Sequence, residues 1–82
     1  MKLFDQIERI NRLHDLIRSR STGTPRELAR RLQISESRLY QIIEELKNME
    51  VPIEYNRQRQ TYYYTYAYEM RLTALFRPLD HP

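Results

Sequence analysis

The chain has 82 residues, which is enough for one small domain with a single compact core. It contains no cysteine, which excludes a disulfide scaffold and a thiolate metal site, and no run of about 18 apolar residues could cross a membrane. The net charge of +3 is compatible with nucleic-acid binding, and twelve of the fourteen basic residues are arginines, which bind phosphate and guanine bidentately. The charged start, MKLFDQIERIN, does not suit a signal peptide, so we expect a cytoplasmic protein.

Two helices are predicted in the first half of the chain. Residues 2–20 carry apolar side chains along one helical stripe, at Leu3, Ile7, Ile10, Leu13 and Ile17. Gly23 then marks a break, since it is the single glycine of the chain. Thr24 and Glu27 have the spacing of a capping box, and Pro25 suits the first helical position. A second helix of at most about ten residues should therefore begin here.

A short turn and a third helix follow. Gln33 and Ile34 form the turn, with Ile34 pointing inward, and Ser35 caps a helix over residues 35–50. Its apolar face contains Leu39, Ile42, Ile43 and Leu46. At about 100° per residue, the opposite face contains Ser37, Gln41, Glu44 and Asn48, with Arg38, Tyr40 and Glu45 on its flanks.

The second half of the chain reads as a β-hairpin. The stretches Ile53–Tyr55 and Thr61–Thr65 are rich in strand-forming residues, and residues 56–60 form the tip between them. From Glu69 to Arg77 apolar residues alternate, which suggests an extra C-terminal strand. The prediction is an α+β, mainly α fold: a winged helix-turn-helix domain over residues 1–68, with three helices and a hairpin wing, and a C-terminal extension over residues 69–82.

The segment GTPRELARRLQIS, residues 23–35, resembles the T-x-x-E-L-A-x-x-L-x-[VI]-S segment of bacterial winged helix-turn-helix repressors. The pattern of Leu39, Tyr40, Ile43, Glu44 and Leu46 is similar to their recognition helix. Residues 51–55, VPIEY, with Tyr62 and Tyr63, are similar to their wing. The chain thus resembles the DNA-binding domains of WYL-domain and DeoR-type transcriptional regulators, over about residues 5–66, and we expect it as a stand-alone domain.

Three positions depart from the family pattern. Gln33 stands where the family usually has glycine with φ > 0, which should cost on the order of 1 kcal/mol. Gln60-Thr61 replaces the paired glycine before the wing tyrosine. The recognition helix has Ser37 and Gln41 where the family often has arginines, followed by two glutamates, so it is less cationic than usual.

The resemblance implies DNA contacts from two groups of residues. A helix in the major groove contacts base edges mainly with its first two turns, so the base-contacting candidates are Ser37, Arg38, Tyr40 and Gln41. Gln41 suits adenine, which it can bond bidentately. The backbone-contacting candidates are Thr24, Arg26, Arg30, Arg57 and Arg59. The alternative for each is a solvated polar side chain on a helix face or a hairpin tip.

The tyrosine cluster and the histidines do not indicate a catalytic or metal-binding site. We expect Tyr62 and Tyr64 in the core, Tyr63 facing outward, and Tyr66 and Tyr68 on a dimer surface. Neither histidine has a partner at metal-ligand spacing, and no activated nucleophile or phosphate loop is present. We therefore expect no enzyme activity, no cofactor, no metal and no small-molecule site, since so small a core leaves little room for a pocket of about 300 Å³.

The predicted function is sequence-specific binding of double-stranded DNA as a small transcriptional regulator. The helix over 35–50 would enter the major groove, and the wing over 56–60 would contact the flanking backbone or minor groove. One such module buries about 600–1,000 Å² on DNA, which favours a homodimer, paired through the C-terminal strand, or a protein partner. The main alternative is a winged-helix protein-interaction module that does not bind DNA, and an RNA-associated domain is a weaker one.

Overall fold

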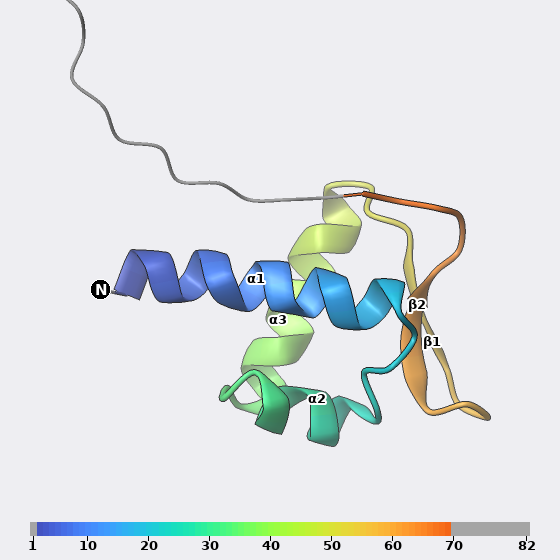
Figure 1. Cartoon of the computed structure of the whole chain (residues 1–82), viewed down its shortest axis with the longest axis horizontal. Helices are drawn as coiled ribbons and strands as arrows, with labels where there is room; N and C mark the ends of the chain where they lie inside the picture. Colours follow the sequence, from blue (N-terminus) through green and yellow to red (C-terminus); the bar gives the residue numbers. More distant parts are fainter. Residues whose placement is uncertain (1, 70–82) are drawn as a thin grey trace, which may run out of the picture.

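The computed structural model describes residues 2–69 of the chain. It contains three helices followed by a two-stranded antiparallel hairpin, an α+β arrangement that is mainly helical (Figure 1). The elements are α1 (Lys2–Arg18), α2 (Pro25–Arg31), α3 (Glu36–Asn48), β1 (Ile53–Asn56) and β2 (Thr61–Tyr64). The expected C-terminal strand, and the dimer contact through it, lie outside the described residues. Within residues 2–69 no helix has the length and apolar character needed to span a membrane.

The helix starts follow the cap residues that the sequence contains. Thr24 is the N-cap of α2, where its hydroxyl accepts a hydrogen bond from the backbone N–H of Glu27 at 3.2 Å. The Glu27 carboxylate accepts in return from the backbone N–H of Thr24 at 3.2 Å, which completes the predicted capping box. Ser35 caps α3 by accepting from the N–H of Arg38 at 3.0 Å. Both predicted starts are therefore confirmed.

All three helices end in the same way, on a left-handed residue that is not glycine. These residues are Arg20 (φ 55°), Gln33 (φ 59°) and Glu50 (φ 68°). In each case the next N–H reaches back across the last turn to a carbonyl five residues earlier, which is the Schellman pattern. The three bonds are Ser21 N to Leu16 O, Ile34 N to Ala29 O and Val51 N to Leu46 O, each 3.0 Å. The left-handed backbone expected at Gln33 is thus confirmed, and the sequence did not point to the other two.

The core lies where the apolar faces of the helices meet one face of the hairpin. The buried residues are Leu13, Ile17, Leu28, Ala29, Leu32, Leu39, Ile42, Ile43, Leu46, Val51, Ile53, Tyr62 and Tyr64. Ile34 is partly buried against them, as expected for the turn between α2 and α3. In the hairpin Tyr62 and Tyr64 pair with Tyr55 and Ile53. The prediction that these two tyrosines belong to the core is confirmed.

Two buried threonines fasten the hairpin to the loop between α1 and α2. The backbone N–H of Tyr62 donates to Thr22 Oγ1 at 2.8 Å, and the N–H of Thr22 donates to Thr61 Oγ1 at 3.2 Å. Each hydroxyl then donates to a carbonyl, that of Gly23 or of Tyr62, both at 2.9 Å. Every buried side-chain polar atom at this joint has a hydrogen-bond partner, and these bonds offset the cost of removing the groups from water. The joint fixes where β2 begins relative to α2.

Candidate functional site

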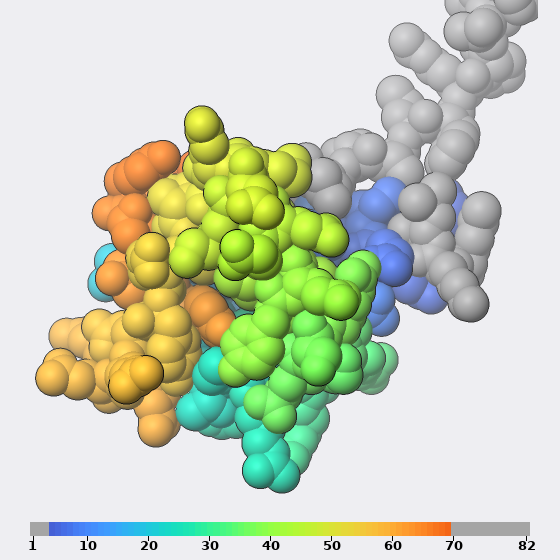
Figure 2. Space-filling view, turned by 180° about the vertical axis from the view of Figure 1, so that it is seen from behind, coloured from blue at the N-terminus to red at the C-terminus, as the bar shows by residue number. Residues whose placement is uncertain are grey.

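The outward face of α3 is polar and forms a shallow hollow. Its lining consists of Ser37, Tyr40, Gln41, Glu44 and Glu45, all of them exposed. Figure 2 shows this side of the molecule, with α3 in green and the hairpin in yellow and orange next to it. Since the opposite face of α3 is buried in the core, only this polar face is available to a partner. The structure therefore gathers three of the four predicted base-contacting residues on one exposed surface.

The fourth, Arg38, lies on the flank and contacts this surface. Its side chain is half-buried, and its Nη1–H donates to Gln41 Oε1 at 3.3 Å. This is an i, i+3 pair, so the two side chains are neighbours along the helix. The geometry orients the Gln41 carboxamide with its oxygen toward the arginine. All four predicted base-contacting residues are thus close together in the structure.

Tyr40 lies on the side of α3 that faces the hairpin. It is 50% exposed, and it is close enough to Tyr62 to affect that residue's ionisation. Burial raises the pKa of the Tyr62 phenol to about 12, and the neighbouring Tyr40 and Tyr55 add to the rise. The rings of Tyr55 and Tyr62 meet edge to face with centroids 4.9 Å apart. This aromatic contact joins the two strands of the hairpin on the side where Tyr40 approaches Tyr62.

The hairpin tip carries two of the predicted backbone-contacting residues. Arg57 and Arg59 are both exposed, and the tip has no acidic residue. The side chain of Asn56 accepts from the N–H of Arg59 at 3.0 Å, which closes the turn. Gln60 then has φ 53°, so a left-handed residue follows the two arginines of the tip. The tip thus presents two cations on a turn with a defined backbone.

The start of α2 is less available than the sequence suggested. Arg26 and Arg30 are exposed, as expected for residues that could reach a phosphate. Both donors of Thr24, however, are directed at Glu27, the hydroxyl at 3.0 Å and the N–H at 3.2 Å. The backbone and side-chain bonds from Thr24 lower the pKa of the Glu27 carboxyl, with a smaller contribution from Arg31 and Arg30. A carboxylate therefore already occupies the place where a phosphate would bind Thr24.

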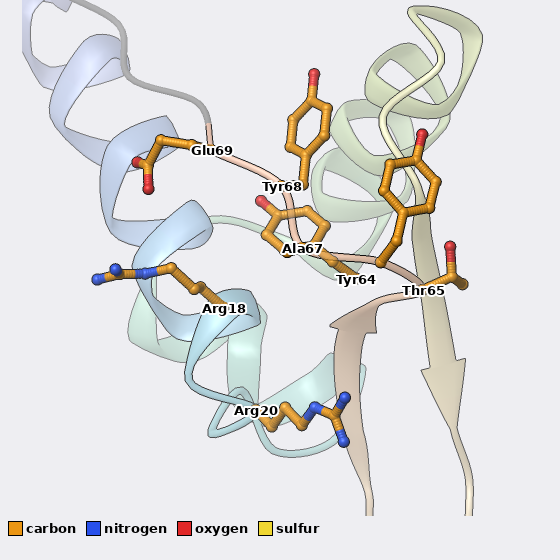
Figure 3. Close-up of a pocket in the computed structure, with 8 residues that line it drawn as sticks. Arg18, Arg20, Tyr64, Thr65, Ala67, Tyr68 and Glu69 are labelled. Carbon is orange, nitrogen blue, oxygen red and sulfur yellow. The ribbon is translucent and has the colours of Figure 1, made fainter.

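A second hollow lies on another part of the surface, between the end of α1 and the segment after β2 (Figure 3). Its volume is about 540 Å³, larger than we expected for so small a core. It is lined by Arg18, Arg20, Tyr64, Thr65, Tyr66, Ala67, Tyr68 and Glu69. The guanidinium of Arg20 lies 5.6 Å from the ring centroid of Tyr63, which is half-buried and alternates along β2 with the buried Tyr62 and Tyr64. Of the two tyrosines expected at a dimer surface, Tyr66 is 61% exposed, whereas Tyr68 is half-buried against the core.

His14 is fully buried behind this hollow and has two partners. Its Nδ1 lies 2.8 Å from the Tyr64 hydroxyl, and its Nε2 lies 3.1 Å from Glu69 Oε1. The neutral tautomer with its proton on Nε2 satisfies both contacts, since it accepts from the tyrosine and donates to the carboxylate. Burial raises the pKa of Tyr64 to about 12. These contacts join α1 to the end of β2 and the segment after it, which the sequence did not indicate. Within residues 2–69 no group of three or more His, Asp or Glu side chains could hold a metal ion.

Comparisons with family models, with curated proteins and with solved structures find no match for this chain.

Proposed function

We propose that this domain is a winged helix-turn-helix similar to those of WYL-domain and DeoR-type regulators, and that it binds double-stranded DNA as a small transcriptional regulator. In this proposal α3 lies in the major groove and the hairpin tip, residues 56–60, contacts the flanking backbone or minor groove. The observation that carries it is the placement of an exposed polar helix face beside a hairpin whose tip carries two arginines.

The geometry supports the proposal because both parts are held in place. The buried face of α3 fixes the rotation of the helix, so Ser37, Tyr40 and Gln41 point outward together. The Thr22–Thr61 joint fixes the hairpin next to α2. A duplex that contacts α3 could therefore meet Arg57 and Arg59 without a rearrangement of the domain.

Phosphate contacts would supply most of the affinity. Arg57 and Arg59 at the tip, with Arg26 and Arg30 on α2, are exposed cations for this role. We leave Thr24 out of the proposed contacts, because its donors are already bonded to Glu27. Since one module buries only about 600–1,000 Å² on DNA, we propose that two copies bind adjacent half-sites.

Fluorescence anisotropy with a short random-sequence duplex tests the proposal. Titrations at several salt concentrations should give binding that weakens steeply with salt, because contacted phosphates release counterions. Arg57→Ala/Arg59→Ala should lower the slope of log K against log salt by about 2, or about 0.9 per lost contact. A matched control is Arg12→Ala/Arg18→Ala, which removes the same charge from exposed positions of α1. An equal decrease of this slope in both variants would mean that Arg57 and Arg59 make no specific contact with the duplex.

One observation favours a second candidate, a protein-interaction module with this fold. Glu44 and Glu45 lie on the exposed face of α3, where they would repel phosphate. If the chain binds no duplex even at low salt, this candidate takes first place. Its interface would be the same α3 face, with a basic partner.

A further inference from the structure

Along the exposed face of α3, the side-chain hydrogen-bonding groups change from donors at Arg38 and Gln41 to an acceptor at Glu44. Arg38 Nη1–H donates to Gln41 Oε1, so this bond takes one of the two lone pairs of the carboxamide oxygen and turns that oxygen toward the arginine. The pair then presents mainly donors, namely the NH₂ group of Gln41 and the other N–H groups of Arg38. Because Arg38 is half-buried, its guanidinium has fewer positions available than that of a fully exposed arginine. The first part of the face therefore offers hydrogen-bond donors in a restricted geometry.

Glu44 supplies the acceptors. It is exposed, lines the same hollow as Gln41 and follows it by three residues, so both lie on one face of the helix. Three residues correspond to about 4.5 Å of helix rise, and successive bases of a strand are about 3.4 Å apart. An ionised carboxylate accepts hydrogen bonds and cannot donate one. Donors and acceptors thus follow each other at about the spacing of neighbouring base pairs.

The bases present matching patterns in the major groove. Guanine offers two acceptors, O6 and N7, whereas adenine offers one acceptor and one donor, and cytosine offers the N4 donor. Bidentate bonding to adenine needs both Oε1 and the NH₂ group of Gln41 directed at the base, whereas Oε1 is directed at Arg38. This orientation favours guanine over the adenine that we expected Gln41 to bind.

We propose that α3 reads a guanine and a cytosine in adjacent base pairs. The Arg38–Gln41 pair donates to the guanine O6 and N7, and Glu44 accepts from the cytosine N4 amino group. Glu44 then acts by exclusion as well, since its carboxylate repels the O4 of thymine and the O6 of guanine at that position. This assignment rests on the proposed DNA-binding function. It gives Glu44 a role in base specificity, whereas its charge alone suggested only a weaker affinity for DNA.

Selection from a randomised duplex library tests the assignment with the full chain. The bound duplexes are sequenced for wild type, for Glu44→Gln and for Glu36→Gln, a control that removes the same charge from an exposed α3 position outside the hollow. Wild type and the control should both enrich adjacent guanine and cytosine. Glu44→Gln should still select the guanine, but its preference for cytosine at the next position should fall about tenfold. Replacing the selected guanine by 7-deazaguanine, which lacks the N7 acceptor, should weaken wild type about tenfold and Gln41→Ala less.

The outcomes separate the assignment from the function on which it rests. If the library binds in a salt-dependent way but enriches A·T pairs, or if Glu44→Gln selects the same bases as wild type, the assignment is overturned and DNA binding stands. If a folded chain retains no duplex at low salt, the DNA-binding proposal fails and the assignment fails with it.

Discussion

Gln33→Gly isolates the cost of the backbone conformation that ends α2. Gln33 has φ 59°, and its backbone N–H donates to Arg30 O at 3.1 Å in the closing turn. No hydrogen bond or ion pair of its exposed side chain is found in the described part of the chain. Replacing Gln33 by glycine therefore removes few contacts and mainly relieves the strain of a left-handed backbone.

The expected gain follows from two opposing terms. A left-handed conformation costs an L-residue about 1–2 kcal/mol, whereas the additional freedom of glycine in the unfolded chain costs about 0.5–1 kcal/mol. We expect a net stabilisation of about 0.5–1 kcal/mol. In a domain of this size each kcal/mol shifts Tm by about 4–8 °C, so Tm should rise by about 2–8 °C.

Thermal unfolding followed by circular dichroism measures this shift. The matched control is Gln41→Gly, which places the same change in the interior of α3, where the backbone is right-handed. There glycine should lower the stability by about 0.5–1 kcal/mol, so the two variants should move Tm in opposite directions. If Gln33→Gly lowers Tm as the control does, the reasoning about the left-handed helix end is refuted.

Three further predictions concern the contacts between the helices and the hairpin. Thr22→Val leaves the N–H of Tyr62 without its acceptor and should cost about 1–3 kcal/mol in urea unfolding, while Thr65→Val, at an exposed position, should cost little. Tyr64→Phe removes the hydroxyl that bonds His14 and should cost about 1–3 kcal/mol in the same assay; an unchanged midpoint would contradict the observed contact. Burial raises the pKa of Tyr62 and Tyr64 to about 12, above the unfolded value of 10.0, so the stability they contribute is complete below about pH 10 and lost as the pH rises toward 12. In an absorbance titration these two tyrosines should ionise last, and complete ionisation near pH 10 with the fold intact would contradict their burial.

The features that sequence predicted well depend on a few neighbouring residues. The capping box at Thr24 and the cap at Ser35 need only a short polar side chain at the right spacing from the first turn. The hairpin follows from two strand-forming stretches with a polar tip between them. Apolar spacing along α3 also placed Ser37 and Gln41 on the exposed face, so most of the candidate site followed from periodicity.

The features that sequence missed depend on residues far apart or on a lack of local signals. Thr22 and Thr61 meet across 39 positions, and His14 and Tyr64 across 50, so neither contact has a local pattern. Arg20 and Glu50 adopt left-handed conformations without the glycine that usually marks a helix end. The bond between Arg38 and Gln41 directs the carboxamide oxygen toward the arginine, and it depends on side-chain rotamers that no spacing rule fixes.

The joint between Thr22 and Thr61 also has a consequence for the order of folding. Contacts between distant residues require closure of a long loop before they form, whereas α2 and α3 are adjacent in the chain and can pair early. Docking of the hairpin on the α1–α2 loop should therefore be a late step, and an opening that detaches the hairpin would break this joint while α2 and α3 stay paired. A duplex that needs both α3 and the hairpin tip would bind only the docked form and would draw the population toward it. Under the proposed function, DNA would then slow hydrogen exchange at the buried amides of Thr22 and Tyr62, although neither is placed in contact with it.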